Sequence, residues 1–490
     1  ESLTEDIFDY IPPQKTNQVF TPKRVVKMMV DMLEKKYPGV FSDPSIKFLD
    51  PYAKSGLYIT EVTKRLYKGL KAHIPNSEER IKWILENQVY AVAPSKILYN
   101  IVRNYVYPDN LRSSAKNIAH LDLTQYMGSN QNWTQVLAKS FGGEALKFDV
   151  IIGNPPYQRQ MEGTSDDPIY HLFMDHAYKL ADKVCFITPA RFLFNAGKTP
   201  KLWNEKMLKD CHLRVVFYEQ NSSRIFPGMS FAGGVAITYR DAHHDFGPIG
   251  TFIPHAQLKS TLEKVLSLDF TTIVPLVYAP ESYKFSETLH EDYPDVQNRL
   301  SRGHMYDVVT NIFEKLPEVF LDSKPDDGED YIQILGLENR VRRYKWIRRN
   351  YLREHDNLER FKVILPTSNG SGAIGEVVPT MLIGEPVLGL PFVGHTQSFI
   401  SIGCFETEYE ATAALKYIKT KFARALLGIL KVTQHNKQNT WRYVPLQDFT
   451  TDSDIDWSKS IAEIDQQLYE KYALTTNEVA FIETSIRAME

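Results

Sequence analysis

The sequence lacks the marks of secreted, zinc-stabilised and membrane-spanning proteins. It has three cysteines in 490 residues, Cys185, Cys211 and Cys404, and no Cys-x-x-Cys pair. We therefore expect neither a disulfide framework nor a zinc site, and the few cysteines favour a reducing compartment such as the cytoplasm. No run of about 18 apolar residues occurs, so no membrane-spanning helix is expected. The histidines are not spaced as metal ligands, and no metal is predicted.

Two further absences concern the start of the chain and nucleotide hydrolysis. Residues 1–6 carry neither the basic nor the apolar segment of a signal peptide. They also lack an initiator methionine, and we interpret the chain as a piece of a longer protein. No Gly-x-x-x-x-Gly-Lys-Ser/Thr loop is present, so we expect no helicase motor in this chain.

The chain has little net charge. Its formal net charge is −3, so any affinity for nucleic acid must come from a local basic patch. Hydrophobic residues make up 43% and charged residues 24% of the chain, which is ordinary for a globular protein with a sizeable core. The length favours two or three domains.

The first half of the chain alternates short apolar runs with amphipathic segments. Strands are expected at 47–51, 88–94, 118–122, 148–153, 184–188, 213–218 and 234–239, and helices at 25–33, 55–70, 95–104 and 168–180. Near-continuous apolar strands between helices predict an α/β fold with a mostly parallel sheet. Ligands of such sheets bind at the carboxyl ends of the strands. The residues after Leu49, Val92, Leu121 and Ile152 are therefore expected to share one crevice.

The motif Asn154-Pro155-Pro156-Tyr157 follows the predicted strand 148–153. An exocyclic amine conjugated to its ring is a poor nucleophile, and acceptors that bind its two hydrogens favour the pyramidal, nucleophilic form. The Asn154 side-chain oxygen and the Pro155 carbonyl can be these acceptors. The tandem prolines stiffen the turn and fix the direction in which that carbonyl points. The Tyr157 ring offers a face on which a flipped base can stack. The alternative is a rigid turn between a strand and a helix.

With this motif the chain resembles the gamma-order amino-methyltransferases, close to the Eco57I-type restriction–modification methylases, over residues 15–240. The resemblance implies a Rossmann-like class I methyltransferase fold and S-adenosyl-L-methionine as the cofactor. It further implies that the chain methylates adenine N6 in DNA, in a bacterial or phage-encoded restriction–modification or phage-defence system.

The resemblance also implies roles for single residues. The segment from Val19 to Pro22 matches one that contacts the methionine end of the cofactor, and Asp50-Pro51 with Ser55-Gly56 resembles the first cofactor motif. The implied cofactor contacts are Phe20, Thr21, Pro22, Asp50, Pro51, Gly56, Ala93, Asp122, Leu123 and Asn154. Tyr157 and Phe226 are the implied contacts to the target base, with a core role as the alternative for Phe226.

Two positions depart from the family pattern. Lys54 stands where the first motif usually has its first glycine, so its side chain either crowds the cofactor or turns outward toward solvent or DNA. Ala93 stands where an acidic residue usually holds the ribose hydroxyls. Losing that acceptor weakens cofactor binding by about 1.5–3 kcal/mol. These departures predict weak cofactor affinity of the chain alone or an altered cofactor pose.

The rhythm of strands and helices fades beyond a predicted linker at 243–250. We predict a methyltransferase domain over 1–245, a mixed α+β target-recognition domain over 246–455 and a helical tail over 456–490. A cationic run with interleaved aromatics suits phosphate contacts, although a solvated helix face, partly neutralised by Glu354 and Glu359, is the alternative. Its members are Arg340, Arg342, Arg343, Lys345, Arg348 and Arg349. A second polar segment can read base edges through Gln434, Asn436, Lys437, Asn439 and Arg442.

Several functions remain open at this point. Methylation of cytosine N4 uses the same turn as methylation of adenine N6. A DNA-binding specificity subunit with a degenerate methyltransferase fold would explain Lys54 and Ala93. Methylation of RNA or protein is a further alternative. The expected partners are double-stranded DNA and a restriction endonuclease, a helicase subunit or a missing fused domain.

Overall fold

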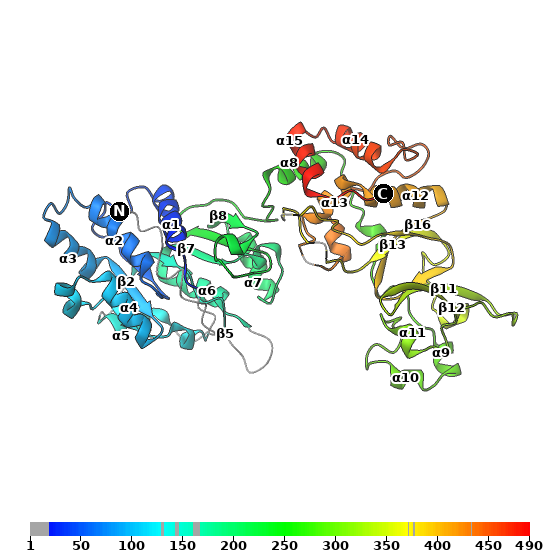
Figure 1. Ribbon diagram of the computed structural model, residues 1–490, viewed down its shortest axis with the longest axis horizontal. Helices are drawn as coiled ribbons and strands as arrows, with labels where there is room; N and C mark the ends of the chain where they lie inside the picture. Colours follow the sequence, from blue (N-terminus) through cyan, green and yellow to red (C-terminus); the bar gives the residue numbers. More distant parts are fainter. Residues whose placement is uncertain are drawn as a thin grey trace. The chain divides into compact units, whose positions relative to one another are not determined.

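The computed structural model describes residues 19–128, 132–142, 147–159, 167–370, 372–375, 378–432 and 434–490. The chain divides into two compact units, Glu1–Phe252 and Ile253–Glu490 (Figure 1). Their boundary lies shortly after residue 245, where the first domain is predicted to end.

Within the described residues, the first unit holds a seven-stranded sheet of order β3-β2-β1-β4-β7-β9-β8. The strands are β1 (Phe48–Asp50), β2 (Val89–Ala93), β3 (Ile118–His120), β4 (Phe148–Gly153), β7 (Ala181–Pro189), β8 (Leu213–Glu219) and β9 (Val235–Asp241). Only β9 runs antiparallel to its neighbours in this sheet. The mostly parallel sheet predicted from the apolar runs is therefore confirmed.

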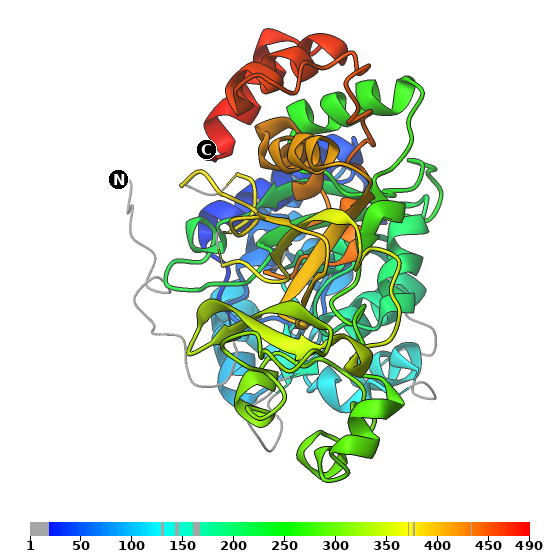
Figure 2. The same ribbon diagram turned by 90° about the vertical axis from the view of Figure 1, so that its right-hand side faces the viewer.

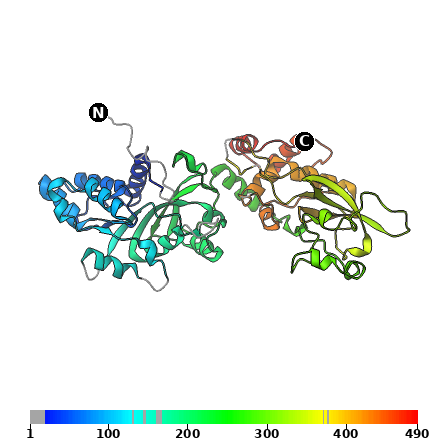
Figure 3. The ribbon, with the colours of Figure 1, turned by 60° about the horizontal axis from the view of Figure 1, so that its bottom comes forward.

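The helices of the first unit cover this sheet (Figure 3). Those expected from the sequence are α1 (Lys23–Lys36), α2 (Leu57–Gly69), α4 (Lys96–Val106) and α6 (Tyr170–Leu180). The structure adds α3 (Ser77–Asn87), α5 (Trp133–Phe141), α7 (Lys201–Lys209) and the short strands β5 (Gln158–Arg159) and β6 (Asp167–Pro168). The missed helix α3 has a local start signal, because the Asn76 side chain accepts hydrogen bonds from Glu78 N and Glu79 N.

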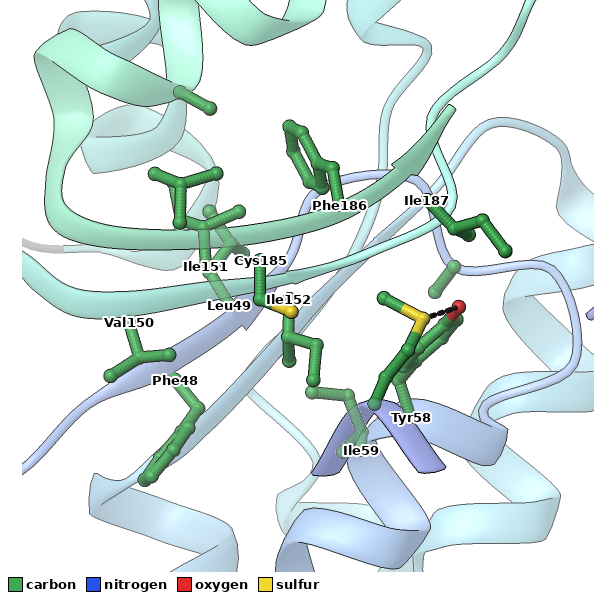
Figure 4. Close-up of a cluster of buried hydrophobic side chains, with 14 of the residues drawn as sticks. Phe48, Leu49, Tyr58, Ile59, Val150, Ile151, Ile152, Cys185, Phe186 and Ile187 are labelled. Atoms are coloured by element: carbon green, nitrogen blue, oxygen red, sulfur yellow. Dashed lines mark hydrogen bonds between the residues drawn. The ribbon is translucent and has the colours of Figure 1, made fainter. Parts of the chain in front are cut away.

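Both faces of the sheet are apolar (Figure 4). Val150 and Ile152 on β4 point to the side of Ile59 on α2, while Ile151 points to the opposite side. All three β4 side chains are fully buried. Burial on both faces explains why these strands read as continuous apolar runs, and each such side chain contributes about 1.5–3 kcal/mol to folding.

The chain order of the strands creates a switch point between β1 and β4. The chain moves outward from β1 through β2 to β3 and then returns to place β4 beside β1, with Leu49 opposite Ile151. Because these strands are parallel, their carboxyl ends meet at one edge of the sheet, where α/β proteins bind ligands.

In its described residues, the second unit mixes helices with two small sheets (Figure 2). A four-stranded sheet has the order β10-β16-β13-β14 and a three-stranded sheet the order β12-β11-β15. The strands are β10 (Val277–Tyr278), β11 (Tyr331–Glu338), β12 (Val341–Arg348), β13 (Phe361–Pro366), β14 (Val387–Gly389), β15 (Val393–His395) and β16 (Phe399–Phe405). The helices are α8 (Ala256–Ser267), α9 (Glu287–Asp292), α10 (Val296–Arg299), α11 (Ile312–Lys315), α12 (Glu408–Lys419), α13 (Lys421–Gly428), α14 (Ile461–Lys471) and α15 (Thr476–Ser485).

The predicted helical tail is an integral part of the second unit. Ile464, Leu468 and Tyr472 are buried in the same apolar cluster as Trp441. Asp465 on α14 accepts hydrogen bonds from the backbone N–H groups of residues 421 and 422, where α13 begins. The tail therefore supplies core and capping contacts that the rest of this unit needs.

Glu478 links α15 to α8 and offers a test of this packing. Its carboxylate accepts hydrogen bonds from Lys264 Nζ, Ser260 Oγ and Thr475 N, each at 2.6 Å. Burial raises the pKa of Glu478, but these bonds outweigh burial and lower the pKa from 4.5 to about 2. Because the folded state has the lower pKa, this stabilisation is present above pH 4.5 and is lost as the pH falls toward 2.

We expect Glu478→Gln to lower the free energy of unfolding by about 1.5–3 kcal/mol at pH 7, because a charged acceptor is lost. The difference from the wild type should shrink as the pH falls below 4.5. Urea unfolding at several pH values measures both effects, and Glu470→Gln, at an exposed position of α14, is the control. A loss that is the same at every pH would contradict the assignment.

Candidate active site

Four predicted positions meet at the carboxyl edge of the sheet. Asp50 ends β1, Ala93 ends β2, Asp122 follows β3 and Asn154 follows β4. Backbone hydrogen bonds join the loops, since Ala53 N donates to Val92 O at 2.8 Å and Leu121 N donates to Ala93 O at 3.0 Å. The strand pairing thus brings these positions to one edge, as the apolar pattern predicts.

Asn154 is buried and its amide has one defined orientation. Its Nδ2 donates to Val19 O at 3.2 Å and to Thr21 Oγ1 at 3.0 Å. A backbone carbonyl can only accept, so the amide nitrogen must face it and Oδ1 must point the other way. No described residue donates a hydrogen bond to the buried Oδ1. The site therefore presents a buried acceptor that a ligand with an N–H group can satisfy.

The segment 19–22 lies across this edge and ties several elements together. Lys54 Nζ donates a hydrogen bond to Val19 O at 2.9 Å, so this carbonyl oxygen accepts hydrogen bonds from both Lys54 and Asn154. Thr21 Oγ1 also receives Tyr58 Oη at 3.4 Å, and Tyr58 Oη lies 3.1 Å from Met29 Sδ (Figure 4). Pro22 then leads into α1, and the side chains of residues 20 and 22 are half-buried.

Asp50 and Lys54 are both buried beside the switch point. Asp50 is 2% and Lys54 6% exposed. Burial raises the pKa of Asp50, while the hydrogen bond from Tyr52 N at 3.1 Å and the charge of Lys54 oppose that rise. Burial lowers the pKa of Lys54, and the charge of Asp50 opposes that fall. The option that Lys54 turns outward to solvent or DNA is wrong for this structure, because the side chain points inward to the Val19 carbonyl.

Two glycines allow the close packing at this edge. Gly56 begins α2 with φ 77°, a left-handed conformation that favours glycine. Gly153, which sequence reasoning overlooked, lies so close to Asp50 that a Cβ atom would stand 2.9 Å from Oδ1. Its position at the end of an apolar strand, directly before Asn154, could have indicated this role from the sequence. Pro51 follows Asp50 in the buried start of the loop.

The adenine and ribose positions differ in what they offer. Asp122 Oδ1 accepts hydrogen bonds from Thr124 N at 3.0 Å and from Thr124 Oγ1 at 2.7 Å. Its other oxygen, Oδ2, has no partner among the described residues. Leu123 is fully buried and serves the core. Ala93 is also fully buried, and Ser95 after it caps α4 by accepting Leu98 N. The residues that end and follow β2, 93–95, supply no carboxylate to hold a ribose.

Tyr157, at the end of the turn, lies between buried aromatic rings and a cavity. Pro155 and Pro156 are buried, and Tyr157 packs edge-to-face on Phe226 and Phe231 with ring centroids 6.4 and 5.2 Å apart. A cavity of about 360 Å³ adjoins it. Its lining includes Tyr157, Tyr170, Pro189, Arg191, Lys198 and Phe231. Phe226 is only 2% exposed, supports Tyr157 from the core and does not line the cavity. Phe231 lines the cavity, although the sequence motifs did not point to it.

The cationic run of the second unit forms a β-hairpin and not a helix face. Strands β11 and β12 pair antiparallel around a turn at Asn339 and Arg340, both with positive φ, as two-residue hairpin turns require. The six cations are not equivalent. The exposed ones are Arg340 and Arg343, and Arg342 donates to Glu385 O.

The other three cations are paired with carboxylates inside the unit. Lys345 is buried and lies 2.8 Å from Glu338 and 3.0 Å from Asp322. Arg348 pairs with Asp327, and Arg349 with Glu354 and Glu359. These pairs reduce the charge that Lys345, Arg348 and Arg349 present to a phosphate, and those of Arg349 are with the two glutamates expected to neutralise part of the run.

The second polar segment lies beside another loop. Asn369 N donates to Gln434 O at 2.8 Å, and Asn436 N donates to Thr367 O at 2.6 Å. The Asn436 side chain is buried and its Oδ1 accepts Trp441 Nε1 at 2.8 Å, so it holds the fold together. The exposed members of the predicted set are Gln434, Lys437, Asn439 and Arg442.

The described residues contain neither a cluster of metal-ligand side chains nor a membrane-spanning helix. No three His, Cys, Asp or Glu side chains in these parts of the chain are grouped as a metal site requires. No helix in them is both long enough and apolar enough to cross a bilayer.

Comparison with known proteins identifies the segment that carries the motif. Residues 87–226 match the model of the Eco57I restriction-modification methylase family. The chain is also 25% identical, over 295 residues, to an uncharacterised adenine-specific methylase of Mycoplasma pneumoniae, covering 48% of this chain and 69% of that protein. The family match includes the turn at Asn154 and leaves out the loop that holds Asp50 and Lys54.

Two solved structures resemble the chain more distantly. A nuclease-deletion mutant of the Type ISP restriction-modification enzyme LlaGI, solved with a DNA substrate mimic, is 13% identical with a TM-score of 0.45, covering 93% of this chain and 47% of that chain. DrdV bound to DNA is 13% identical with a TM-score of 0.44, covering 92% of this chain and 57% of DrdV. The chain thus spans about half the length of these enzymes. The family model and the bacterial relative confirm the resemblance to the Eco57I-type restriction–modification methylases that the motifs predict, and methyltransferase as the enzyme class.

Proposed function

We propose that this chain is an S-adenosyl-L-methionine-dependent DNA methyltransferase that methylates N6 of a flipped adenine in a restriction–modification or phage-defence system. The observation that carries the proposal is the buried Oδ1 of Asn154, which no described residue satisfies. Val19 O and Thr21 Oγ1 hold the amide so that this oxygen is free to accept a hydrogen bond.

Asn154 and Pro155 would act on the target amine. Oδ1 and the Pro155 carbonyl accept its two N–H groups, which favours the pyramidal nitrogen and stabilises the positive charge that develops on it. The cofactor, when bound, would supply a methyl group carried on a sulfonium sulfur, which is left neutral once the methyl group is on the amine nitrogen. The extra proton of the methylated amine then leaves to water.

The residues at the carboxyl edge fit this cofactor at two of its three parts. The segment 19–22, Asp50 and the start of α2 at Gly56 would hold the methionine end. Asp122, whose Oδ2 has no partner among the described residues, would accept the adenine amine. The buried Ala93 offers no ribose acceptor, so the two ends carry most of the binding.

Tyr157 and Phe231 would hold the target base, with Phe226 supporting Tyr157 from behind. The adjoining cavity of about 360 Å³ is within the size range of sites for small ligands. A base enters such a site only after it leaves the helical stack. The turn serves adenine N6 and cytosine N4 alike, and a specificity subunit without turnover would share the fold. Product analysis distinguishes these functions.

Asn154→Ala removes the proposed acceptor. We expect methyl transfer to DNA to fall by about 10²–10³-fold, because one preorganised group that stabilises the developing charge is lost. Affinity for duplex DNA should remain within a few-fold of the wild type. Incorporation of a labelled methyl group measures the rate, and mass spectrometry of digested nucleosides identifies the methylated base. Full activity of Asn154→Ala would remove Asn154 from the site. A wild type that binds DNA and methylates nothing would favour the specificity-subunit function.

Thr21 tests whether the orientation of Asn154 matters. Thr21→Val keeps the shape of the side chain but removes the oxygen that accepts Asn154 Nδ2 at 3.0 Å. We expect slower methyl transfer and a loss of about 1–3 kcal/mol of folding free energy, because a buried N–H loses a partner. Thr21→Ser keeps the oxygen and is the matched control. Equal behaviour of the two variants would show that Thr21 does not orient the amide.

The second unit would bind double-stranded DNA. The exposed Arg340 and Arg343 of the hairpin would contact phosphates, which position a protein without reading sequence. The exposed Gln434, Lys437, Asn439 and Arg442 carry the groups that read base edges. Arg342, Lys345, Arg348 and Arg349, which bind within the unit, would mainly shape the hairpin. A restriction endonuclease or helicase subunit, or a fused domain, would complete the system.

Replacing Arg340 and Arg343 together with Gln tests the hairpin. Each phosphate contact contributes about 0.9 to the slope of log affinity against log salt, so the slope should fall by up to about 2. Arg353→Gln with Arg360→Gln is the matched control, because it removes the same charge from arginines that pair with Glu287 and Glu406. Fluorescence anisotropy over a salt series gives both slopes. The same decrease in both double variants would mean that only net charge matters.

A further inference from the structure

The Lys54 amine is buried and makes no direct ion pair with a described carboxylate. Its side chain is 6% exposed and Nζ makes one hydrogen bond, to Val19 O at 2.9 Å. Among the described residues, no carboxylate oxygen lies within 4.0 Å of it. An ammonium has three donors, and a buried charge is costly unless it is paired. The nearest aromatic face, that of Tyr52, is 5.4 Å from Nζ and provides weak compensation.

Asp50 is the complementary group. Its carboxylate is buried beside the same edge and receives the Tyr52 backbone N–H, yet it makes no ion pair with Lys54. The carboxyl edge of the sheet therefore holds a buried amine and a buried carboxyl group that make no direct ion pair with each other. A ligand that carries a carboxylate and an ammonium on one carbon, an α-amino acid group, has the charges that both require.

Asp50 and Lys54 lie at one end of the proposed cofactor site. Lys54 binds the carbonyl of Val19, in the segment proposed to contact the methionine end, and lies in the loop between β1 and α2. The family pattern has a glycine at this position, which contributes no charge. Relative to the family pattern, Ala93 removes an acceptor for the ribose, which lowers the affinity for the cofactor. Lys54 adds a hydrogen-bond donor to the same site, which can raise that affinity.

We infer, resting on the proposed function, that Lys54 binds the α-carboxylate of the cofactor's methionine end. The remaining Nζ donors make charge-assisted hydrogen bonds to that carboxylate while one donor stays on the Val19 carbonyl. Lys54 thereby compensates for the absent ribose carboxylate and makes cofactor affinity depend on the amino-acid end of the ligand.

Isothermal titration calorimetry with two ligands isolates this contact. The ligands are S-adenosyl-L-methionine and its decarboxylated form, which lacks only the carboxylate. Each is titrated into the wild type, Lys54→Met and the control Lys64→Met, an exposed lysine on α2. The Met variant keeps the apolar stem of the side chain, and binding of the decarboxylated ligand reports that the variant is folded.

We expect the wild type and Lys64→Met to bind S-adenosyl-L-methionine more tightly than the decarboxylated ligand. In Lys54→Met its affinity should fall by about 10–100-fold, because a charged hydrogen bond is lost, while affinity for the decarboxylated ligand changes less than about 3-fold.

Three outcomes would overturn the inference. An equal loss for both ligands would mean that Lys54 only holds the segment 19–22. A gain for both would mean that Lys54 occupies the space of the cofactor. Failure of the wild type to bind either ligand while it still binds DNA would contradict the proposed function itself, and this inference with it.

Discussion

One backbone carbonyl, that of Val19, holds the candidate active site together. It accepts hydrogen bonds from two buried side chains, Asn154 and Lys54, which come from loops after β4 and β1. Because a carbonyl oxygen can only accept, this contact determines which way the Asn154 amide faces. The segment 19–22 would otherwise carry an unpaired polar group against the sheet. The same bond thus orders the segment and orients the catalytic candidate.

The site also depends on how the sheet is built. Strands β1 and β4 are adjacent although about a hundred residues separate them, and their apolar side chains pack against helices on both faces. This rigid core brings Asp50 and Asn154 to one edge. Gly153 then permits an approach that any larger residue would prevent. Polar groups that are costly to bury are retained at the point where a polar, charged ligand would satisfy them.

The second unit shows how a charge run in the sequence can mislead. Six cations lie between residues 340 and 349, yet Lys345, Arg348 and Arg349 meet carboxylates that lie elsewhere in the chain or in the following loop. The alternation of side chains along β12 and its pairing with β11 decide which cations face outward. The same applies to Asn436, a polar residue in a polar segment that serves Trp441.

Local patterns in the sequence were sufficient for the strands of the seven-stranded sheet, their mostly parallel arrangement, the turn at Asn154 and the family resemblance, because these depend on short apolar runs and on motifs a few residues long. Only the tertiary structure decided where Lys54 points, that the Asn154 amide is turned so that its Oδ1 has no described partner, that Phe231 and not Phe226 lines the cavity, and which arginines are exposed. Each of these depends on partners distant in the chain, whose positions follow from strand order and packing and not from local sequence.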